Sequence, residues 1–181
     1  MKKLIYTAFI VLFAIAGVAC KKKDSPAPAI DKNLGFFPLQ VGNYWRINSD
    51  NYAEIKEKKI LNGKEYFHYQ ALVGGDAFDN AYYRIDGNKL IQGYNFYTDV
   101  PEVLIADFNE ALDEVFYATT ILSNPNNIKI TVIEKSEDTM KFKYEESVSG
   151  KPNIYFRTFR KGVGLDEKYD EIKINGVVYK F

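Results

Sequence analysis

Hydrophobic and polar residues alternate with a period of two along most of the chain after residue 43, and this pattern predicts β-strands. In segment 128–134, for example, Ile128, Ile130 and Val132 alternate with Lys129 and Thr131. Further strands are expected over 44–49, 54–61, 64–72, 80–86, 88–94, 101–106, 140–147, 154–160 and 165–170. A helical period is weak everywhere, and only residues 107–114 are expected to form a helical turn or two.

Turn residues between these segments predict hairpins. The dipeptides Asn62-Gly63, Asp86-Gly87 and Asn175-Gly176 tolerate positive φ at both positions of a two-residue β-turn. Two looser turns are expected at 136–138 and 149–152. Repeated hairpins at this spacing favour an antiparallel sheet with up-and-down connections.

A two-residue turn at Asn175-Gly176 also fixes which residues of the final hairpin face each other. Ile174 then opposes Val177, and Ile172 opposes Tyr179. This face carries Ile172, Ile174, Val177 and Tyr179, which we expect to be buried, and also Phe181. The opposite face carries mainly charged side chains, as a half-buried strand pair requires.

Composition agrees with a β fold. The chain contains 14 Tyr, 13 Phe and 1 Trp, and such aromatic residues suit pleated sheets. We predict an all-β fold, an up-and-down antiparallel sheet of roughly ten strands with at most one short helix, curled into a barrel, half-barrel or sandwich. Residues 35–181 are expected to form a single domain, because they are enough for one core and too few for two.

The start of the chain is a segment of another kind. A basic Met1-Lys2-Lys3 precedes an apolar run over 4–19, which ends in small residues directly before Cys20, the only cysteine. These are the parts of a secretory signal. With a cysteine directly after the cleavage site, the segment resembles a bacterial lipoprotein signal. The resemblance implies that residues 1–19 are removed, that Cys20 is acylated, and that the protein is held on an envelope membrane. We expect the outer membrane, on its periplasmic or surface face.

Two other interpretations of this segment stay open. The apolar run has sixteen residues, whereas a membrane-spanning helix needs about twenty, so an uncleaved membrane helix would be short. A lone cysteine cannot form an internal disulfide, so Cys20 could instead be a free thiol in a secreted protein.

Residues 20–34 are polar and proline-bearing, and we predict that they form a tether between the membrane and the domain. The lysines at 21–23 could touch anionic lipid head groups, although a solvated linker is the simpler interpretation. Removing residues 1–19 takes away two lysines and leaves 22 basic against 24 acidic residues, a net charge of −2. This balance excludes the strongly basic surface expected of a nucleic-acid-binding protein.

Two motifs resemble those of a protein family. Segment 36–45, Phe-Phe-Pro-Leu-Gln-Val-Gly-Asn-Tyr-Trp, opens the domain, and Gly162-Val163-Gly164-Leu165 lies near its end. With the signal, they resemble small lipoproteins of Bacteroidetes-type bacteria, which carry an F-P-L-x-x-G-N-x-W opening and a late G-V-G-L segment. Arg46-Ile47 departs from the family pattern, which has an aromatic residue two positions after the tryptophan. The resemblance implies an antiparallel β domain on an envelope membrane and no particular chemistry.

The sequence offers little for nucleophilic or metal catalysis. His68 is the only histidine and lies in mid-strand between Phe67 and Tyr69, where we expect a structural role. One histidine and one anchored cysteine cannot form a zinc site. No serine lies in a G-x-S-x-G elbow. We therefore predict no catalytic residue, no metal and no cofactor.

Acidic residues leave one enzymatic alternative open. Asp107, Glu110, Asp113 and Glu114 lie close in sequence and could supply the carboxylate pair of a glycan hydrolase. With 24 acids in the chain, however, such neighbours also arise by chance. Loop 74–80 has oxygen ligands but lacks the closing glutamate of a calcium loop, so we expect no metal there.

The candidate ligand-binding residues are aromatic: Trp45, Tyr83, Tyr94 and Phe96. The turn at Asp86-Gly87 would place the strand of Tyr83 beside the segment of Tyr94 and Phe96. If exposed, these rings would form a platform for sugars or apolar ligands. If buried, they would be ordinary core, which is the interpretation that we favour for them and for Trp45.

The sequence thus predicts a non-catalytic envelope lipoprotein that binds a lipid-like ligand or docks to an outer-membrane protein assembly. A glycan hydrolase is the alternative. A cavity on the order of several hundred Å³ would favour a lipid carrier. A polar cleft with paired carboxylates would favour the hydrolase. If the structure has neither feature, the docking role is left by elimination.

Overall fold

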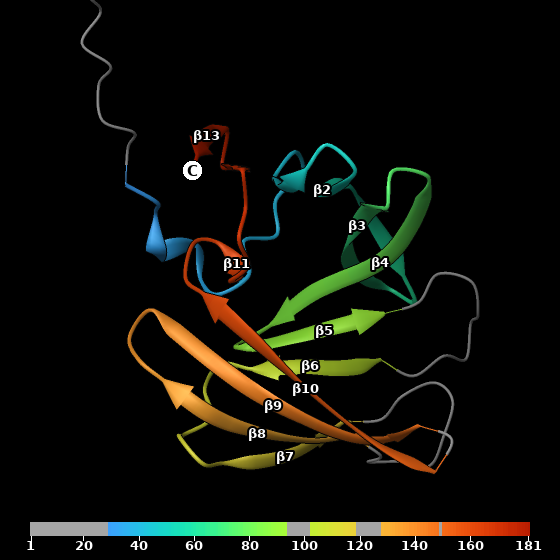
Figure 1. The fold of residues 1–181 in the computed structure, drawn as a ribbon, viewed down its shortest axis with the longest axis vertical. Helices are drawn as coiled ribbons and strands as arrows, with labels where there is room; N and C mark the ends of the chain where they lie inside the picture. Colours follow the sequence, from blue (N-terminus) through green and yellow to red (C-terminus); the bar gives the residue numbers. More distant parts are fainter. Residues whose placement is uncertain (1–28, 94–101, 119–127, 149) are drawn as a thin grey trace, which may run out of the picture.

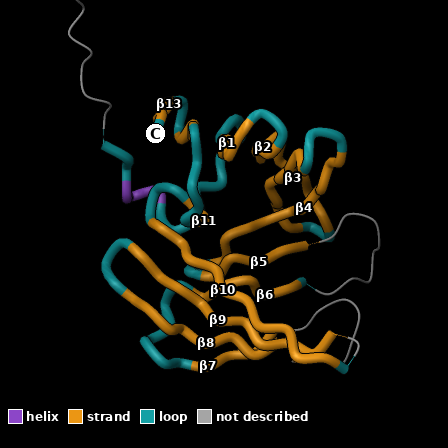
Figure 2. Tube along the Cα trace, in the orientation of Figure 1, coloured by secondary structure: helices purple, strands orange, loops and turns teal. Residues whose placement is uncertain are grey.

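The computed structural model describes residues 29–93, 102–118, 128–148 and 150–181. Over these residues the chain forms two antiparallel β-sheets that lie against each other without closing into a barrel (Figures 1 and 2). The predicted all-β antiparallel fold is therefore confirmed, in its half-barrel or sandwich form.

The larger sheet has eight strands, and the smaller sheet has five. In spatial order the larger sheet contains β13 (Val177–Lys180), β12 (Glu171–Ile174), β1 (Tyr44–Asn48), β2 (Asn51–Leu61), β3 (Lys64–Val73), β4 (Ala77–Asp86), β5 (Lys89–Gly93) and β6 (Val103–Asp107). The smaller sheet contains β11 (Gly164–Leu165), β10 (Lys151–Arg160), β9 (Thr139–Val148), β8 (Ile128–Lys135) and β7 (Val115–Ala118). A 3₁₀ helix, η2 (Lys32–Leu34), precedes the first strand.

Most neighbouring strands follow each other in sequence, but the C-terminal hairpin does not. β12 pairs with β1, so the first strand of the domain lies between β2 and the last hairpin of the chain. The larger sheet is consequently complete only when both ends of the domain are present.

Three segments differ from the sequence prediction. β7 was not predicted, and the strand expected over 165–170 is reduced to the two residues of β11. Of residues 107–114, Asp107 ends β6 and 108–114 form turns and irregular segments rather than a helix. The reason is that both ends of this connection are tied to strands: the Phe108 N–H donates to the Asn88 carbonyl at 2.9 Å, and the Asp113 N–H donates to the Val132 carbonyl at 2.8 Å.

The predicted hairpin turns are confirmed at Asn62-Gly63 and Asn175-Gly176, where φ is positive at both positions. The turn predicted at Asp86-Gly87 is wrong by one residue. Asp86 pairs with Lys89, so the turn consists of Gly87 and Asn88, with a φ of 60° at Gly87. A glycine at the first position is equally suited to a two-residue hairpin turn.

The register predicted for the last hairpin is confirmed, because Ile174 pairs with Val177 and Ile172 with Tyr179. Ile172, Ile174 and Tyr179 are buried, as expected. Val177 is not: it is 36% exposed, and Phe181, predicted on the same face, is 69% exposed. The predicted burial of Val177 is wrong because β13 is an edge strand and Val177 is its first residue, next to the turn.

Buried side chains form two groups. The first includes Leu90, Val103, Ile130, Val132, Met140, Phe142, Tyr144 and Phe159. The second consists of Trp45, Ile55, Val163, Tyr169, Ile172, Ile174 and Tyr179. Phe37 touches both, with its ring centroid 6.1 Å from that of Trp45 and 6.2 Å from that of Phe159. This aromatic residue, N-terminal to the first strand, joins the two groups.

Residues 30–34, which we assigned to the tether, lie against the domain. Ile30 and Leu34 pack on the second buried group. Gly162 makes this close approach possible, since a Cβ there would lie 2.5 Å from the Asp31 carbonyl oxygen. The contacts of the folded domain therefore begin near residue 30 rather than at 35.

Candidate functional site

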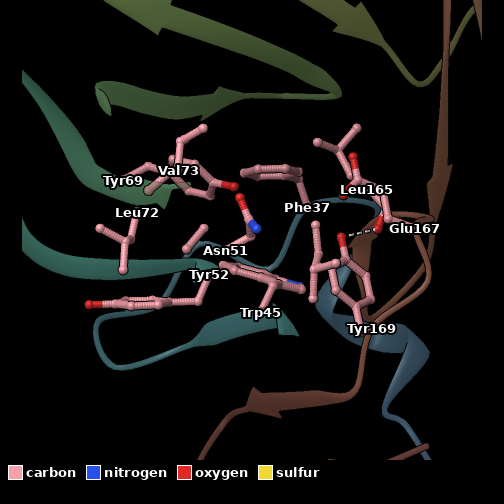
Figure 3. A pocket seen from close by; sticks show the side chains of 13 residues that line it. Phe37, Trp45, Asn51, Tyr52, Tyr69, Leu72, Val73, Leu165, Glu167 and Tyr169 are labelled. Carbon is pink, nitrogen blue, oxygen red and sulfur yellow. Dashed lines mark hydrogen bonds between the residues drawn. The ribbon is translucent and has the colours of Figure 1, made fainter. Parts of the chain in front are cut away.

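An open hollow of about 140 Å³ lies on the inner side of the larger sheet (Figure 3). Its walls are mostly aromatic and aliphatic. Phe37 and Trp45 present roughly parallel rings, with an interplanar angle of 22°. Tyr69 comes from β3, and Leu165 and Tyr169 close the hollow from the segment at and after β11.

Small residues in one cross-strand row create this space. Trp45 on β1 pairs with Ala53 on β2, and Ala53 pairs with Ala71 on β3. Residues that pair directly on neighbouring strands project on the same face. Two methyl groups beside the large indole therefore leave a gap that longer side chains would fill. The sequence analysis identified Trp45 but not the two alanines, because their alignment depends on the register.

Trp45 serves as a wall of the hollow and as core at the same time. Only 4% of its surface is exposed, and its indole Nε1 donates a hydrogen bond to the Val163 carbonyl at 2.5 Å. Val163 belongs to the Gly-Val-Gly-Leu motif, so the two motifs of the sequence meet at this hydrogen bond. The ring position is fixed by contacts that do not depend on a ligand.

Apolar side chains continue from the hollow to the surface. Ile47, near the end of β1, is 40% exposed, and Val73, at the end of β3, is 52% exposed. Isolated exposed aliphatic residues are common, but these two lie at the rim of an apolar hollow. The opening is thus bordered by surface that an apolar group can contact.

The polar groups of the hollow are phenols, the Asn51 amide and the Glu167 carboxylate. Burial raises the pKa of Tyr69, and the nearby Tyr83 and Glu167 raise it further. Burial also raises the pKa of Tyr169, whose hydroxyl donates to the Leu165 carbonyl at 2.7 Å. Both phenols remain protonated at neutral pH, so they act as hydrogen-bonding groups rather than as charges or bases.

The other aromatic candidates have different positions. Tyr83 packs on the first buried group, with its ring centroid 5.5 Å from those of Phe37 and Tyr69. It lines a second, smaller cavity of about 30 Å³, which shares Phe37, Tyr69 and Leu165 with the hollow. Tyr94 and Phe96 lie outside the described residues.

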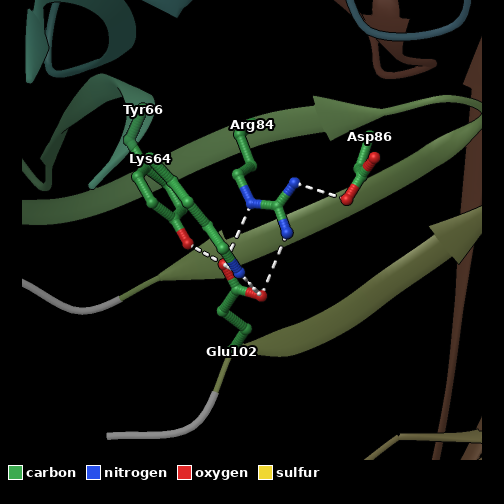
Figure 4. Close-up of polar contacts among 5 residues, drawn as sticks. All are labelled: Lys64, Tyr66, Arg84, Asp86 and Glu102. Atoms are coloured by element: carbon green, nitrogen blue, oxygen red, sulfur yellow. Dashed lines mark hydrogen bonds and ion pairs between the residues drawn. The ribbon is translucent and has the colours of Figure 1, made fainter. Parts of the chain in front are cut away.

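Polar residues gather on the opposite face of the larger sheet, around Glu102 (Figure 4). Arg84 donates to both Glu102 oxygens, from Nε at 2.9 Å and from Nη2 at 3.0 Å. Lys64 Nζ lies 3.0 Å from the same carboxylate, and the Tyr66 hydroxyl also donates to it. Arg84 and the other donors lower the pKa of Glu102 to about 2, so it is ionised. The sequence analysis did not single out this cluster, since its members come from β3, from β4 and from Glu102, the residue before β6.

The predicted acidic cluster is not a single site. Asp107 is buried, accepts a hydrogen bond from the Asn109 N–H at 3.1 Å and lies 3.7 Å from Lys89 Nζ. Asp113 and Glu114, by contrast, are exposed on the connecting turn. The four acids thus consist of a buried, turn-stabilising Asp107, a half-buried Glu110 and two exposed carboxylates.

His68 has a structural environment. Its Nε2 lies 2.8 Å from Asn80 Oδ1, its Nδ1 lies 3.7 Å from Glu57 Oε1, and its ring stacks on Tyr82 at 4.9 Å. The partner of Nε2 is an amide, which cannot serve as a nucleophile in the way a serine hydroxyl does.

The loop considered for calcium is largely strand and turn. β4 begins at Ala77, inside the segment 74–80. The Gly75 N–H donates to the Asp50 carbonyl at 2.9 Å, which fastens the turn to the β1–β2 connection. Within the described ranges, no three His, Cys, Asp or Glu side chains are grouped so as to hold a metal ion.

Comparisons with known proteins do not identify the chain. No family model, curated protein or solved structure matches it. In the part of the chain that the structure describes, no helix has the length and apolar character to cross a membrane. Cys20 lies outside that part, so its acylation stays a prediction.

Proposed function

We propose that this chain is a non-catalytic envelope lipoprotein, anchored through acylated Cys20, whose β domain docks to a protein partner by accepting one apolar group in the hollow beside Trp45. The support for the anchor is the signal-like start of the sequence. The support for docking is the hollow.

The size of the hollow is the observation that carries the proposal. Pockets for drug-sized ligands measure about 300–1,000 Å³, whereas this hollow measures about 140 Å³. An apolar cavity of about 150 Å³ holds one benzene molecule. The space suits one ring or one branched side chain and is too small to enclose a lipid. We therefore favour docking over lipid transport.

The charges favour binding over glycan hydrolysis. A hydrolase needs one carboxyl with a raised pKa as the general acid. Glu102, the carboxyl around which polar residues gather in Figure 4, has the opposite property, because its pKa is lowered to about 2. Its lone pairs are engaged by Arg84, Lys64 and Tyr66, which suits a structural role.

Filling the hollow tests the docking proposal. Ala71→Phe would place a ring in the hollow, and Ala111→Phe, at an exposed position on the connection between β6 and β7, is the matched control. Trp45 is the only tryptophan, so its emission reports occupancy directly. We expect N-acetyl-phenylalaninamide and toluene to change this emission saturably in the natural protein and in Ala111→Phe, but not in Ala71→Phe.

The same titration separates docking from transport. Stoichiometric binding of a fatty acid such as laurate, or a lipid that co-purifies with the membrane-extracted protein, would favour the carrier instead. An emission that responds equally in Ala71→Phe would show that the hollow is not the binding site.

The anchor has a separate test. Cys20→Ala should yield a folded domain that no longer sediments with membranes, because the acylation site is lost. Fractionation of cells followed by immunoblotting measures this. A Cys20→Ala protein that is cleaved normally and stays with the membrane would contradict the lipid attachment.

A further inference from the structure

Strand β10 has an edge that is mostly open. All ten of its residues pair with β9, but only Phe159 and Arg160 pair with β11 on the other side. The Asp166 N–H then donates to the Thr158 carbonyl at 2.7 Å, and the chain turns away. Among the described residues, no strand covers positions 151–157 on this side.

This edge is longer than the other sheet edges in the part of the chain that the structure describes. Proteins protect sheet edges with short strands, charges or proline. The edge strand β6 has five residues, and β7 and β13 have four each. β10 has ten residues, with Lys151 and Pro152 protecting only its first end. Between Pro152 and Phe159, Arg157 is the only charged residue of the strand.

The backbone at this edge is oriented for strand pairing. Hydrogen-bonding directions alternate along an antiparallel strand. Since the Thr158 carbonyl accepts from Asp166, the N–H and carbonyl groups of Ile154 and Phe156 point to the same, open side. Their side chains are 51% and 55% exposed and lie on the outer face of the sheet.

Charge on β10 is of one sign. The strand carries Lys151, Arg157 and Arg160 and no acidic residue. Arg46, Arg84 and Arg160 each have a carboxylate within 4 Å. Arg157 is the fourth arginine; its guanidinium lies 5.4 Å and 5.5 Å from the rings of Tyr144 and Tyr155, and within the described ranges no carboxylate pairs with it.

Arg157 also connects the edge to the hollow. It lines the smaller cavity, which shares Phe37, Tyr69 and Leu165 with the hollow. Leu165 belongs to β11, which already occupies the edge next to Phe159. A strand that continued the line of β11 along β10 would therefore pass directly beside both cavities.

We propose that the open edge of β10 binds an extended segment of a partner protein as an added antiparallel strand, with an acidic side chain of that segment pairing with Arg157. The proposal rests on the docking function above and specifies the class of partner. Backbone groups of Ile154 and Phe156 supply the pairing, while the apolar group that enters the hollow comes from the same segment. A second copy of this chain is disfavoured as the occupant, because two β10 strands would bring only positive charges together.

A peptide library provides the test. Immobilised dodecapeptides with varied residues at every position are probed with the unacylated domain, and bound peptides are then studied in solution. We expect acidic, apolar-alternating peptides to be selected. Their binding should slow the amide hydrogen exchange of Ile154 and Phe156 in the domain, and it should weaken at least tenfold in Arg157→Gln.

Phe156→Pro removes the edge-facing N–H without touching the β9 ladder, and Phe156→Ala removes the same ring but keeps that N–H. Loss of binding in the proline variant but not in the alanine variant supports strand addition, provided that both unfold at similar denaturant concentrations. If the proline variant does not fold, the exchange of Ile154 and Phe156 in the natural protein decides the question.

The outcomes that overturn the proposal are distinct. A library without any binder, or binders that leave the exchange of Ile154 and Phe156 unchanged, exclude strand addition at β10. Peptides that leave this exchange unchanged could still alter Trp45 emission in the natural protein and not bind Ala71→Phe. In that case the docking function stands, and only the proposal that the peptide adds a strand to β10 is wrong. A dimer that forms in sedimentation experiments and is abolished by Phe156→Pro would assign the edge to a second copy.

Discussion

The two faces of strand β3 carry two sites of opposite character. Tyr69 faces inward, where Trp45, Phe37 and two alanines leave an apolar hollow partly empty. Tyr66 faces outward, where its hydroxyl, Lys64 and Arg84 surround Glu102. The outward site is polar, and the Glu102 carboxylate already accepts hydrogen bonds from its neighbours. The inward site is apolar, and part of its space is unfilled.

This difference separates stability from binding. A carboxylate with four donors is held within the protein itself and gains little from a new partner. An apolar wall without packing on one side loses dispersion contacts, and a partner that enters the hollow would restore them. A dense polar network is thus a weaker indication of a binding site than a small gap beside a fixed tryptophan.

The largest effect is expected for Trp45→Ala. The indole is 4% exposed and hydrogen-bonded to Val163, so its removal should lower the free energy of unfolding by about 3–5 kcal/mol. Urea unfolding followed by circular dichroism measures this change. A loss below about 1 kcal/mol would mean that the wall of the hollow is not part of the core.

Glu102→Gln should have a smaller effect. The substitution weakens hydrogen bonds to charged donors and should cost about 1.5–3 kcal/mol of stability, without altering Trp45 emission. Glu65→Gln is the matched control, because Glu65 pairs with Lys58 at 2.9 Å on the exposed surface and should cost at most about 1 kcal/mol. Equal losses in the two variants would contradict the special role of the Glu102 cluster.

The contribution of Glu102 should also depend on pH. Its pKa falls from an ordinary 4.5 to about 2 in the folded protein, mainly through Arg84. A lowered carboxyl pKa stabilises the fold fully above pH 4.5, and this stabilisation disappears as the pH falls toward 2. The difference in melting temperature between the natural protein and Glu102→Gln should therefore shrink over this interval. A constant difference from pH 6 to pH 2 would be inconsistent with the lowered pKa.

The smallest effect is expected for Ala71→Leu. Filling part of the hollow should raise the free energy of unfolding by about 0.5–1 kcal/mol, while Ala111→Leu, at an exposed position outside the hollow, should leave it unchanged. Thermal unfolding of the two variants provides the comparison. A destabilised Ala71→Leu would show that the space is already occupied by its neighbours.

Local chemistry made much of the fold predictable. Asn62-Gly63 and Asn175-Gly176 specify their turns through positive φ, and the turn then sets the register of each hairpin. β7 was missed because its four residues, Val-Phe-Tyr-Ala, show no alternation of apolar and polar positions. The pairing of β1 with β12 could not be read from the sequence, since strands so far apart leave no local signal of their contact.

The candidate site was less predictable for a related reason. Trp45 is conspicuous as the only tryptophan of the sequence. The hollow, however, depends on Ala53 and Ala71 lying in the same cross-strand row. Arg157 and Glu102 look alike as isolated charges, and only the fold shows that Glu102 is surrounded by donors while Arg157 lies over two tyrosine rings. The sequence identifies residue types that are able to bind a partner. Tertiary contacts decide which of these side chains are already paired within the protein.

The position of β1 between β2 and β12 has a consequence for the order of events during biogenesis. Tyr44, at the start of the domain, donates a hydrogen bond to Glu171, 127 residues further along the chain. Ile172, Ile174 and Tyr179, which complete the buried group around Trp45, are among the last residues to be synthesised. Contacts of such long separation form slowly. A chain that must cross a membrane unfolded would thus be kept from folding early by its own topology, because β1 cannot pair with β12 before the last hairpin has been synthesised.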